Sequence, residues 1–76
     1  MRKSERERFM RAFGKRLYKQ RMKAGLSQQK LASICGLGVN AISTYETCTH
    51  ELGIYAVYRI AAALGCSIEE LTGRWE

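Results

Sequence analysis

The chain has 76 residues, enough for one small domain whose core lies near the lower limit for independent stability. No apolar run approaches the ~18 residues of a membrane span, and the charged N-terminus lacks the apolar segment of a signal peptide. We therefore expect a soluble, cytoplasmic protein with no membrane partner. The three cysteines are odd in number and widely spaced, which argues against a disulfide framework, and Cys35 and Cys66 are predicted to be small buried hydrophobes.

The net charge of +6 is unevenly distributed along the chain. Residues 1–25 hold ten Lys or Arg against Glu5 and Glu7, a net of +8, whereas residues 26–76 have a net of −2. Such asymmetry predicts a polyanionic partner, of which nucleic acid is the commonest. On charge alone, a basic face kept for solubility is the alternative.

The first predicted element is a long helix over about residues 4–24. Ser4 and Glu7 have the S-x-x-E spacing of a capping box, and Gly25 ends the pattern. Apolar residues recur every three or four positions and are expected to face the core: Phe9, Met10, Phe13 and Leu17. Four basic residues are expected to point outward: Lys15, Arg16, Lys19 and Lys23.

Two short helices are predicted next, over about residues 28–35 and 39–47. Apolar residues recur at helical spacing in both: Leu31, Ala32, Ile34, Cys35, Ile42 and Tyr45. Ser27 offers a side-chain oxygen that can cap the first of them, and Gly38 stands just before the second. Helices this short cannot nucleate alone in water, so they must pack against the rest of the chain.

The spacing inside this pair predicts a helix-turn-helix. Ala32 is a small residue at the point where the two helices meet, Gly36 tolerates the positive φ of the turn, and Ile42 anchors the second helix. In such a motif the second helix lies in the major groove of DNA.

The following segment, 47–53, is polar and has no periodicity. Another amphipathic helix is predicted over 53–64, with five residues facing inward: Ile54, Val57, Ile60, Ala61 and Leu64. Ser67 and Glu70 form a second S-x-x-E pattern, which opens a short fifth helix. Cys48 and His50 alone are a weak metal signal, so no metal or other cofactor is expected.

As a set, these residues resemble the Cro and phage-repressor class, the lambda-repressor-like (XRE-type) helix-turn-helix domains. The segments that carry the resemblance are GKRLYKQR (14–21), GLSQQKLA (25–32), the turn at Gly36, AISTYE (41–46) and RIAAALGCSIEEL (59–71). The resemblance implies an all-α, compact five-helix domain over 13–72, with the helix-turn-helix in its second and third helices. Residues 73–76 are then a C-terminal tail.

Residues 1–12 precede the part that resembles the family and form a basic extension. It could lengthen the first helix, contact the DNA backbone as an arm, or stay loose, and we favour a lengthened helix that frays. The loop after the helix-turn-helix also departs from the family, which often has Gly at the position of Cys48 and Pro near Leu52.

The resemblance further implies an ion pair between Arg21 and Glu46, which would lock the first helix to the third and aim the guanidinium toward a phosphate. Two unrelated surface charges are the alternative. If the pair is partly buried, removal of one partner costs ~3–5 kcal/mol.

Two sets of DNA contacts are implied. Gln28 is the family's usual phosphate clamp, and the full set predicted to lie near phosphates is Arg21, Ser27, Gln28, Gly38, Thr49 and His50. The set predicted to read base edges is Val39, Asn40, Ser43 and Thr44. Asn40 can pair with adenine, and the methyl groups of Val39 and Thr44 can meet thymine methyls, so we expect an A·T-leaning half-site of modest specificity. Gly38 replaces the usual Ser or Thr, so one phosphate-binding hydroxyl is missing.

The expected function is therefore sequence-specific transcriptional regulation. We expect the protein to be a bacterial or phage repressor that binds double-stranded DNA in the nucleoid. The alternative is a protein-interaction module, such as an antitoxin, because the reading surface lacks Arg, Lys and Gln. An enzyme is not expected, since no nucleophile and base have usable spacing. The aromatic residues Tyr55, Tyr58 and Trp75 exceed the needs of a small core, and in this family that end of the chain usually forms a homodimer. Trp75 packed over the first helix is the alternative.

Overall fold

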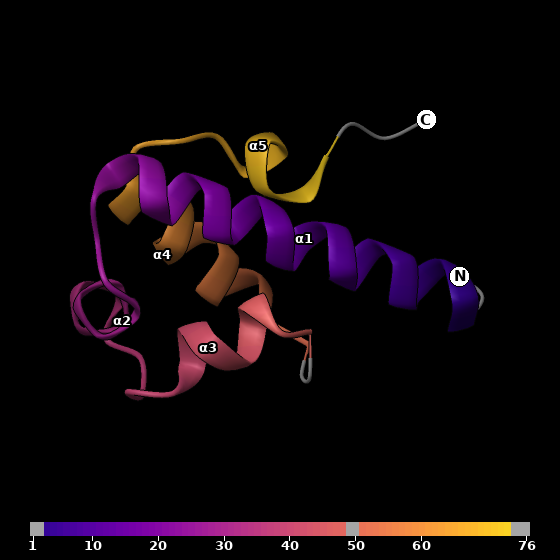
Figure 1. Ribbon diagram of the computed structural model, residues 1–76, viewed down its shortest axis with the longest axis horizontal. Coiled ribbons are helices and arrows are strands. Elements are labelled where there is room, and N and C mark those ends of the chain that lie inside the picture. The colour runs from indigo at the N-terminus through magenta and orange to yellow at the C-terminus, as the bar shows by residue number, and fades with distance from the viewer. Residues whose placement is uncertain (1–2, 49–50, 74–76) are drawn as a thin grey trace.

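All regular structure in the described part of the chain is helical. The computed structural model describes residues 3–48 and 51–73. Its five helices are α1 (Lys3–Ala24), α2 (Gln28–Cys35), α3 (Ala41–Glu46), α4 (Ile54–Leu64) and α5 (Ile68–Thr72) (Figure 1). The predicted all-α, five-helix architecture is confirmed. None of the helices in these two ranges is long and apolar enough to cross a membrane.

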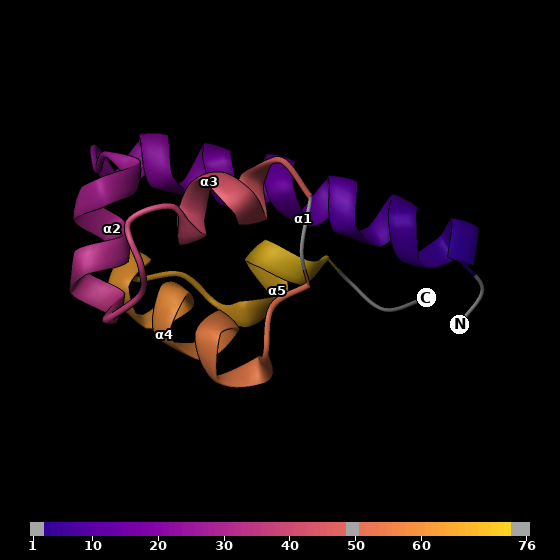
Figure 2. The same cartoon turned by 90° about the horizontal axis from the view of Figure 1, so that it is seen from below.

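Helix α1 spans the long axis of the molecule. Its 22 residues rise about 33 Å at ~1.5 Å per residue, and the longest dimension of the Cα trace is 33 Å. The four shorter helices gather around its C-terminal part, and its N-terminal part extends past them (Figures 1 and 2). The helix includes residues 3–12, and Ser4 lies inside it, so the predicted cap at Ser4 is wrong.

Every helix contributes to one core. The buried residues are Phe13 and Leu17 from α1, Leu31, Ala32 and Cys35 from α2, Ile42 from α3, Ile60 and Ala61 from α4, and Leu71 from α5. Helix α1 contacts α3, α4 and α5, and α2 contacts α3 and α4. Because α3 has six residues and α5 five, each depends on this packing to remain helical.

The helix-turn-helix is present, with one shift in its boundaries. The Ser27 hydroxyl accepts a hydrogen bond from the Lys30 amide at 3.0 Å and caps α2. Gly36 ends α2 with φ 71°, the left-handed conformation expected there. Helix α3 begins at Ala41 rather than at residue 39, because Asn40 is the N-cap with φ −99° and ψ 1°, and Val39 lies in the preceding turn.

Two residues expected to face the core are exposed. Phe9 is 39% exposed because it lines an open cavity with Leu52 and with Val57 of α4 and Thr72 of α5, and its ring stacks on Phe13 with ring centroids 6.5 Å apart. Ile54 is 86% exposed because it is the first residue of α4 and lies a full turn before the buried layer. Cys66 is only half-buried, whereas Cys35 is buried as predicted.

Arg16 does not point away from the protein as expected. One of its guanidinium nitrogens donates to the carbonyl of Thr72 at the C-terminal end of α5, at 3.4 Å. Arg59 likewise donates to the carbonyl of Ile34 near the end of α2, at 3.0 Å. Both arginines therefore place a cation at the negative end of a helix dipole, which joins separate helices.

Candidate nucleic-acid interface

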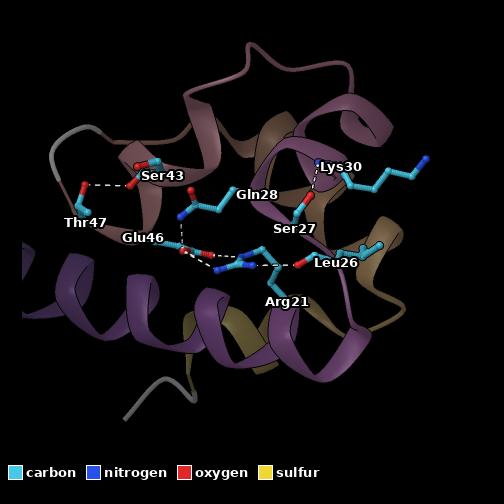
Figure 3. A network of polar contacts seen from close by, with 8 residues as sticks. All are labelled: Arg21, Leu26, Ser27, Gln28, Lys30, Ser43, Glu46 and Thr47. Carbon is cyan, nitrogen blue, oxygen red and sulfur yellow. Dashed lines mark hydrogen bonds and ion pairs between the residues drawn. The ribbon is translucent and has the colours of Figure 1, made fainter.

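A polar network centred on Glu46 joins α1, α2 and α3. The Arg21 Nε donates to Glu46 Oε2 at 2.6 Å, and a second Arg21 nitrogen donates to Oε1 at 3.3 Å. The Gln28 amide nitrogen donates to the same Oε1 at 2.9 Å (Figure 3). The ion pair between Arg21 and Glu46 that the resemblance implied is thus present, and it is bidentate.

This pair is buried and structural in character. The side chains of Arg21 and Glu46 are 8% and 7% exposed. The third Arg21 nitrogen donates to the carbonyl of Leu26 at 2.9 Å, and the Tyr18 ring lies 5.3 Å from the guanidinium carbon. The hydrogen bond to Glu46 raises the pKa of the Arg21 guanidinium, in opposition to the effect of burial, so the side chain stays charged. Because the guanidinium is buried and each of its nitrogens has a partner within the protein, the predicted phosphate contact of Arg21 gains no support from this geometry.

Gln28 keeps part of its hydrogen-bonding capacity. A primary amide has two N–H hydrogens, and Glu46 takes one of them. The side chain is half-buried between α2 and α3, and Ser27 beside it is exposed. The network therefore fixes the amide at the start of α2, and the second N–H of Gln28 is not used by this hydrogen bond.

The predicted reading surface lies at the exposed start of α3. Val39 is 66% exposed, Asn40 and Gly38 are also exposed, and Ser43 and Thr44 are half-buried. Asn40 occupies the N-cap position but makes no side-chain cap hydrogen bond. The Asn40 side-chain amide therefore does not cap the helix, although Asn usually makes a capping hydrogen bond at this position. The Thr44 hydroxyl donates to the Asn40 carbonyl at 2.8 Å, which ties the two residues together.

The close approach of α1 to α3 depends on a residue that sequence reasoning passed over. A Cβ at Gly14 would lie 2.5 Å from the carbonyl oxygen of Glu46, so only glycine lets the two backbones meet there. A glycine inside a strongly helical stretch is the sequence signal that could have identified this contact. Cys48 is a second residue at this contact. It has φ 66° at a position where the family often has Gly, and its thiol donates a hydrogen bond to the Met10 carbonyl of α1 at 3.1 Å.

The remaining predicted contacts cannot be placed. Thr49, His50 and Trp75 lie outside the described residues, so their predicted roles stay predictions. Among residues 3–48 and 51–73, no three His, Cys, Asp or Glu side chains gather in a way that could hold a metal ion. Burial raises the thiol pKa of Cys35 and Cys66, which keeps both protonated near neutral pH.

Comparison with known proteins agrees with this geometry. A family model of helix-turn-helix domains, HTH_3, matches residues 17–71. The restriction-modification controller protein C.AhdI from Aeromonas hydrophila is similar in structure, with a TM-score of 0.78 and 31% identity over 82% of this chain and 94% of that one. A hypothetical transcription factor, NHTF from Neisseria, is similar with a TM-score of 0.79 and 30% identity over 87% of this chain and 77% of that one. No curated protein matches.

The family match covers most of the chain, and it includes α2, α3 and both partners of the buried ion pair. The solved structures share the fold at 30% identity or more. The chain belongs to the XRE/Cro-type helix-turn-helix family HTH_3, and it is a DNA-binding transcriptional regulator.

Proposed function

We propose that the protein recognises a specific DNA sequence by placing the turn at 38–40 and the start of α3 in the major groove. The exposed Asn40 amide is the observation that supports this most directly. It stands at the tip of the motif, and no intramolecular cap uses it. An amide in that position can pair bidentately with adenine N6 and N7.

The neighbouring side chains favour A·T pairs. Val39 is exposed and apolar, and Thr44 contributes a methyl group, so both suit thymine methyls. Ser43 is the remaining polar group of the predicted reading set. The exposed Ser27 and the second N–H of Gln28, both at the start of α2, support a phosphate contact there, which would fix the register of the domain.

Selection of bound sequences from a random DNA pool tests this docking, followed by two substitutions. Asn40→Ala should cost ~1–3 kcal/mol on the selected site and relax the preference at one base pair. Gln28→Ala should instead weaken binding to selected and scrambled DNA alike, because phosphate contacts do not depend on sequence. If neither change alters the affinity for the selected site, this docking is wrong.

We further propose that the protein represses transcription. The resemblance to phage repressors supports this, since a domain seated on a promoter blocks access to it. A reporter driven by a promoter that contains the selected site should lose expression when the protein is present. A gain of expression would reverse the assignment to activation. This function requires no catalysis and places the protein with the DNA in the cytoplasm.

A homodimer is proposed through α4. Ile54, Tyr55 and Tyr58 are 86%, 68% and 56% exposed, and the two tyrosine rings lie 6.2 Å apart. Two copies joined by this apolar patch would read two half-sites. The selected sequence should then be a palindrome with half-site centres about 34–36 Å apart, or one helical turn.

The same patch supports the second candidate function, an interaction module for another protein. The reading surface offers no Arg or Lys, which is the feature that favours it. Measuring the affinity for DNA at increasing salt concentration distinguishes the two functions. Binding through several phosphates loses affinity steeply as salt rises, whereas a contact through apolar side chains does not.

A further inference from the structure

We propose that α1 carries a second DNA-binding site, a row of four cations that contacts the phosphodiester backbone beside the groove read by α3. We call it the basic ridge, and it consists of Arg8, Arg11, Lys15 and Lys19. This inference rests on the proposed function and adds to it a role for the N-terminal extension.

The ridge is continuous and exposed. Its four residues recur every three or four positions, which places them along one side of α1. All four are exposed, and no ion pair joins any of them to another residue of the described ranges. The other arginines that the structure describes are bonded internally: Arg6 to Glu51, Arg16 to Thr72, Arg21 to Glu46 and Arg59 to Ile34. The ridge therefore retains its charge for an external partner.

One residue of the ridge, Arg11, lies beside the C-terminal end of α3. Arg11 lines an open cavity of about 470 Å³ together with Thr47 and Cys48, which directly follow α3. One turn further along α1, Gly14 meets the Glu46 carbonyl. Both views show α1 running alongside α3 and continuing past its C-terminal end (Figures 1 and 2). A duplex held by α3 would thus meet α1 at Arg11, and the other three cations of the ridge continue from there along the helix.

The charges around this cavity leave Arg11 available. The other charged residues that line it are Arg6, Glu7 and Glu51. Arg6 and Glu51 neutralise each other through an ion pair at 2.9 Å. Glu7 lies one turn from Arg11 and offsets one positive charge. The other three ridge cations leave a net positive charge along this side of α1. The local field along α1 is therefore positive.

The reading surface needs such a source of charge. Residues 37–48, which hold the turn and α3, contain no Lys or Arg. Affinity for DNA depends largely on cations that displace counterions from phosphates. From Arg8 to Lys19 the helix rises about 16 Å, at ~1.5 Å per residue, which is long enough to meet more than one phosphate. The ridge supplies the electrostatic attraction that α3 lacks.

A pair of single substitutions tests the ridge. Arg11→Gln and Lys23→Gln each remove one positive charge from α1, but Lys23 lines a cavity with Leu64, Cys66 and Glu70 on the α4–α5 side. The affinity for a 40-base-pair duplex that carries the selected site is measured between 50 and 200 mM salt. Thermal unfolding of each variant, expected to match the wild type, shows that the exposed substitution leaves the fold intact.

The plot of log affinity against log salt has a negative slope, and Arg11→Gln should make it less steep by about 0.9, the share of one phosphate contact. Lys23→Gln should leave the slope unchanged. The double variant Arg8→Gln/Arg11→Gln should make the slope less steep by about 1.8. The ratio of affinities for selected and scrambled DNA should stay constant in all three, in contrast to Asn40→Ala.

Equal slopes for Arg11→Gln, Lys23→Gln and the wild type would overturn the ridge while the proposed function stood. A ridge variant that altered the selected base sequence would also overturn it, since backbone contacts carry no base information. Failure of the wild-type protein to bind DNA at any salt concentration would remove the proposed function and the ridge together.

Discussion

Glu46 joins three helices through one carboxylate. It accepts two hydrogen bonds from Arg21 on α1 and one from Gln28 on α2, while it is itself the last residue of α3. The arrangement ties the start of α2, where we propose that a phosphate binds, to α3, which we propose reads the bases. A change at this one residue should therefore affect stability and DNA binding together.

We predict that Glu46→Gln lowers the free energy of unfolding by ~3–5 kcal/mol, because the buried Arg21 guanidinium would lose its counter-charge. Urea unfolding followed by circular dichroism measures the loss. The control is Glu51→Gln, which breaks the ion pair with Arg6, where both side chains are more than half exposed. That pair should contribute only ~0–1 kcal/mol. Similar losses in the two variants would contradict the structural role given to Glu46.

A second residue-scale prediction concerns Gly14. Gly→Ala inside a helix normally stabilises a protein by up to ~1 kcal/mol. At Gly14 the new Cβ would lie 2.5 Å from the Glu46 carbonyl oxygen, so α3 would have to move. Overpacking of this kind costs ~1–3 kcal/mol, and we expect Gly14→Ala to lower the melting temperature. Gly38→Ala, whose Cβ meets nothing within 4 Å, should leave the melting temperature almost unchanged.

At the scale of elements, the helices with strong local signals were predictable. Ser27 and Gly36 mark the two ends of α2 through backbone chemistry that depends only on neighbouring residues. The start of α3 was not, because Val39 and Asn40 have apolar and capping character that suits either a helix or a turn. Their place is decided by how α3 packs on α1 and α2.

The exposure of two residues predicted to face the core also escaped prediction. Helical periodicity places Phe9 and Ile54 on the inner side of their helices, but it does not say how closely the neighbouring segments pack against each position. Likewise the Gln28–Glu46 hydrogen bond joins residues 18 positions apart, and no local pattern encodes it. The ion pair of Arg21 and Glu46 could be expected only through the family resemblance.

The N-terminal end of α3 yields the next prediction. The family usually carries a hydroxyl at the position of Gly38, and here a side chain at that position would meet open space. Gly38→Ser should therefore fold normally and add one phosphate hydrogen bond. We expect a gain of ~0.5–1.5 kcal/mol in binding, equal for selected and scrambled DNA, in titrations of labelled duplexes. Gly38→Ala is the control and should show no gain.

For the molecule as a whole, charge and apolar surface lie on different elements. The cations are concentrated on α1, whereas the exposed apolar patch on α4 consists of Ile54, Tyr55 and Tyr58. Two copies of α1 would repel each other at close range, because residues 1–25 have a net charge of +8. We therefore propose self-association through α4 rather than α1, an arrangement in which the proposed basic ridge and reading surface of each copy stay available for DNA.

The last prediction tests that assembly with two substitutions at residues of nearly equal exposure. Tyr58 on α4 is 56% exposed and Met22 on α1 is 54% exposed. Since truncating a central aromatic contact typically costs ~2 kcal/mol or more, Tyr58→Asp should weaken dimerisation at least 10-fold in sedimentation equilibrium. Met22→Asp should leave it unchanged. Binding to a palindromic site should become less cooperative in Tyr58→Asp alone, while binding to a single half-site stays the same. If the two variants associate equally well, α4 is not the surface that joins the copies.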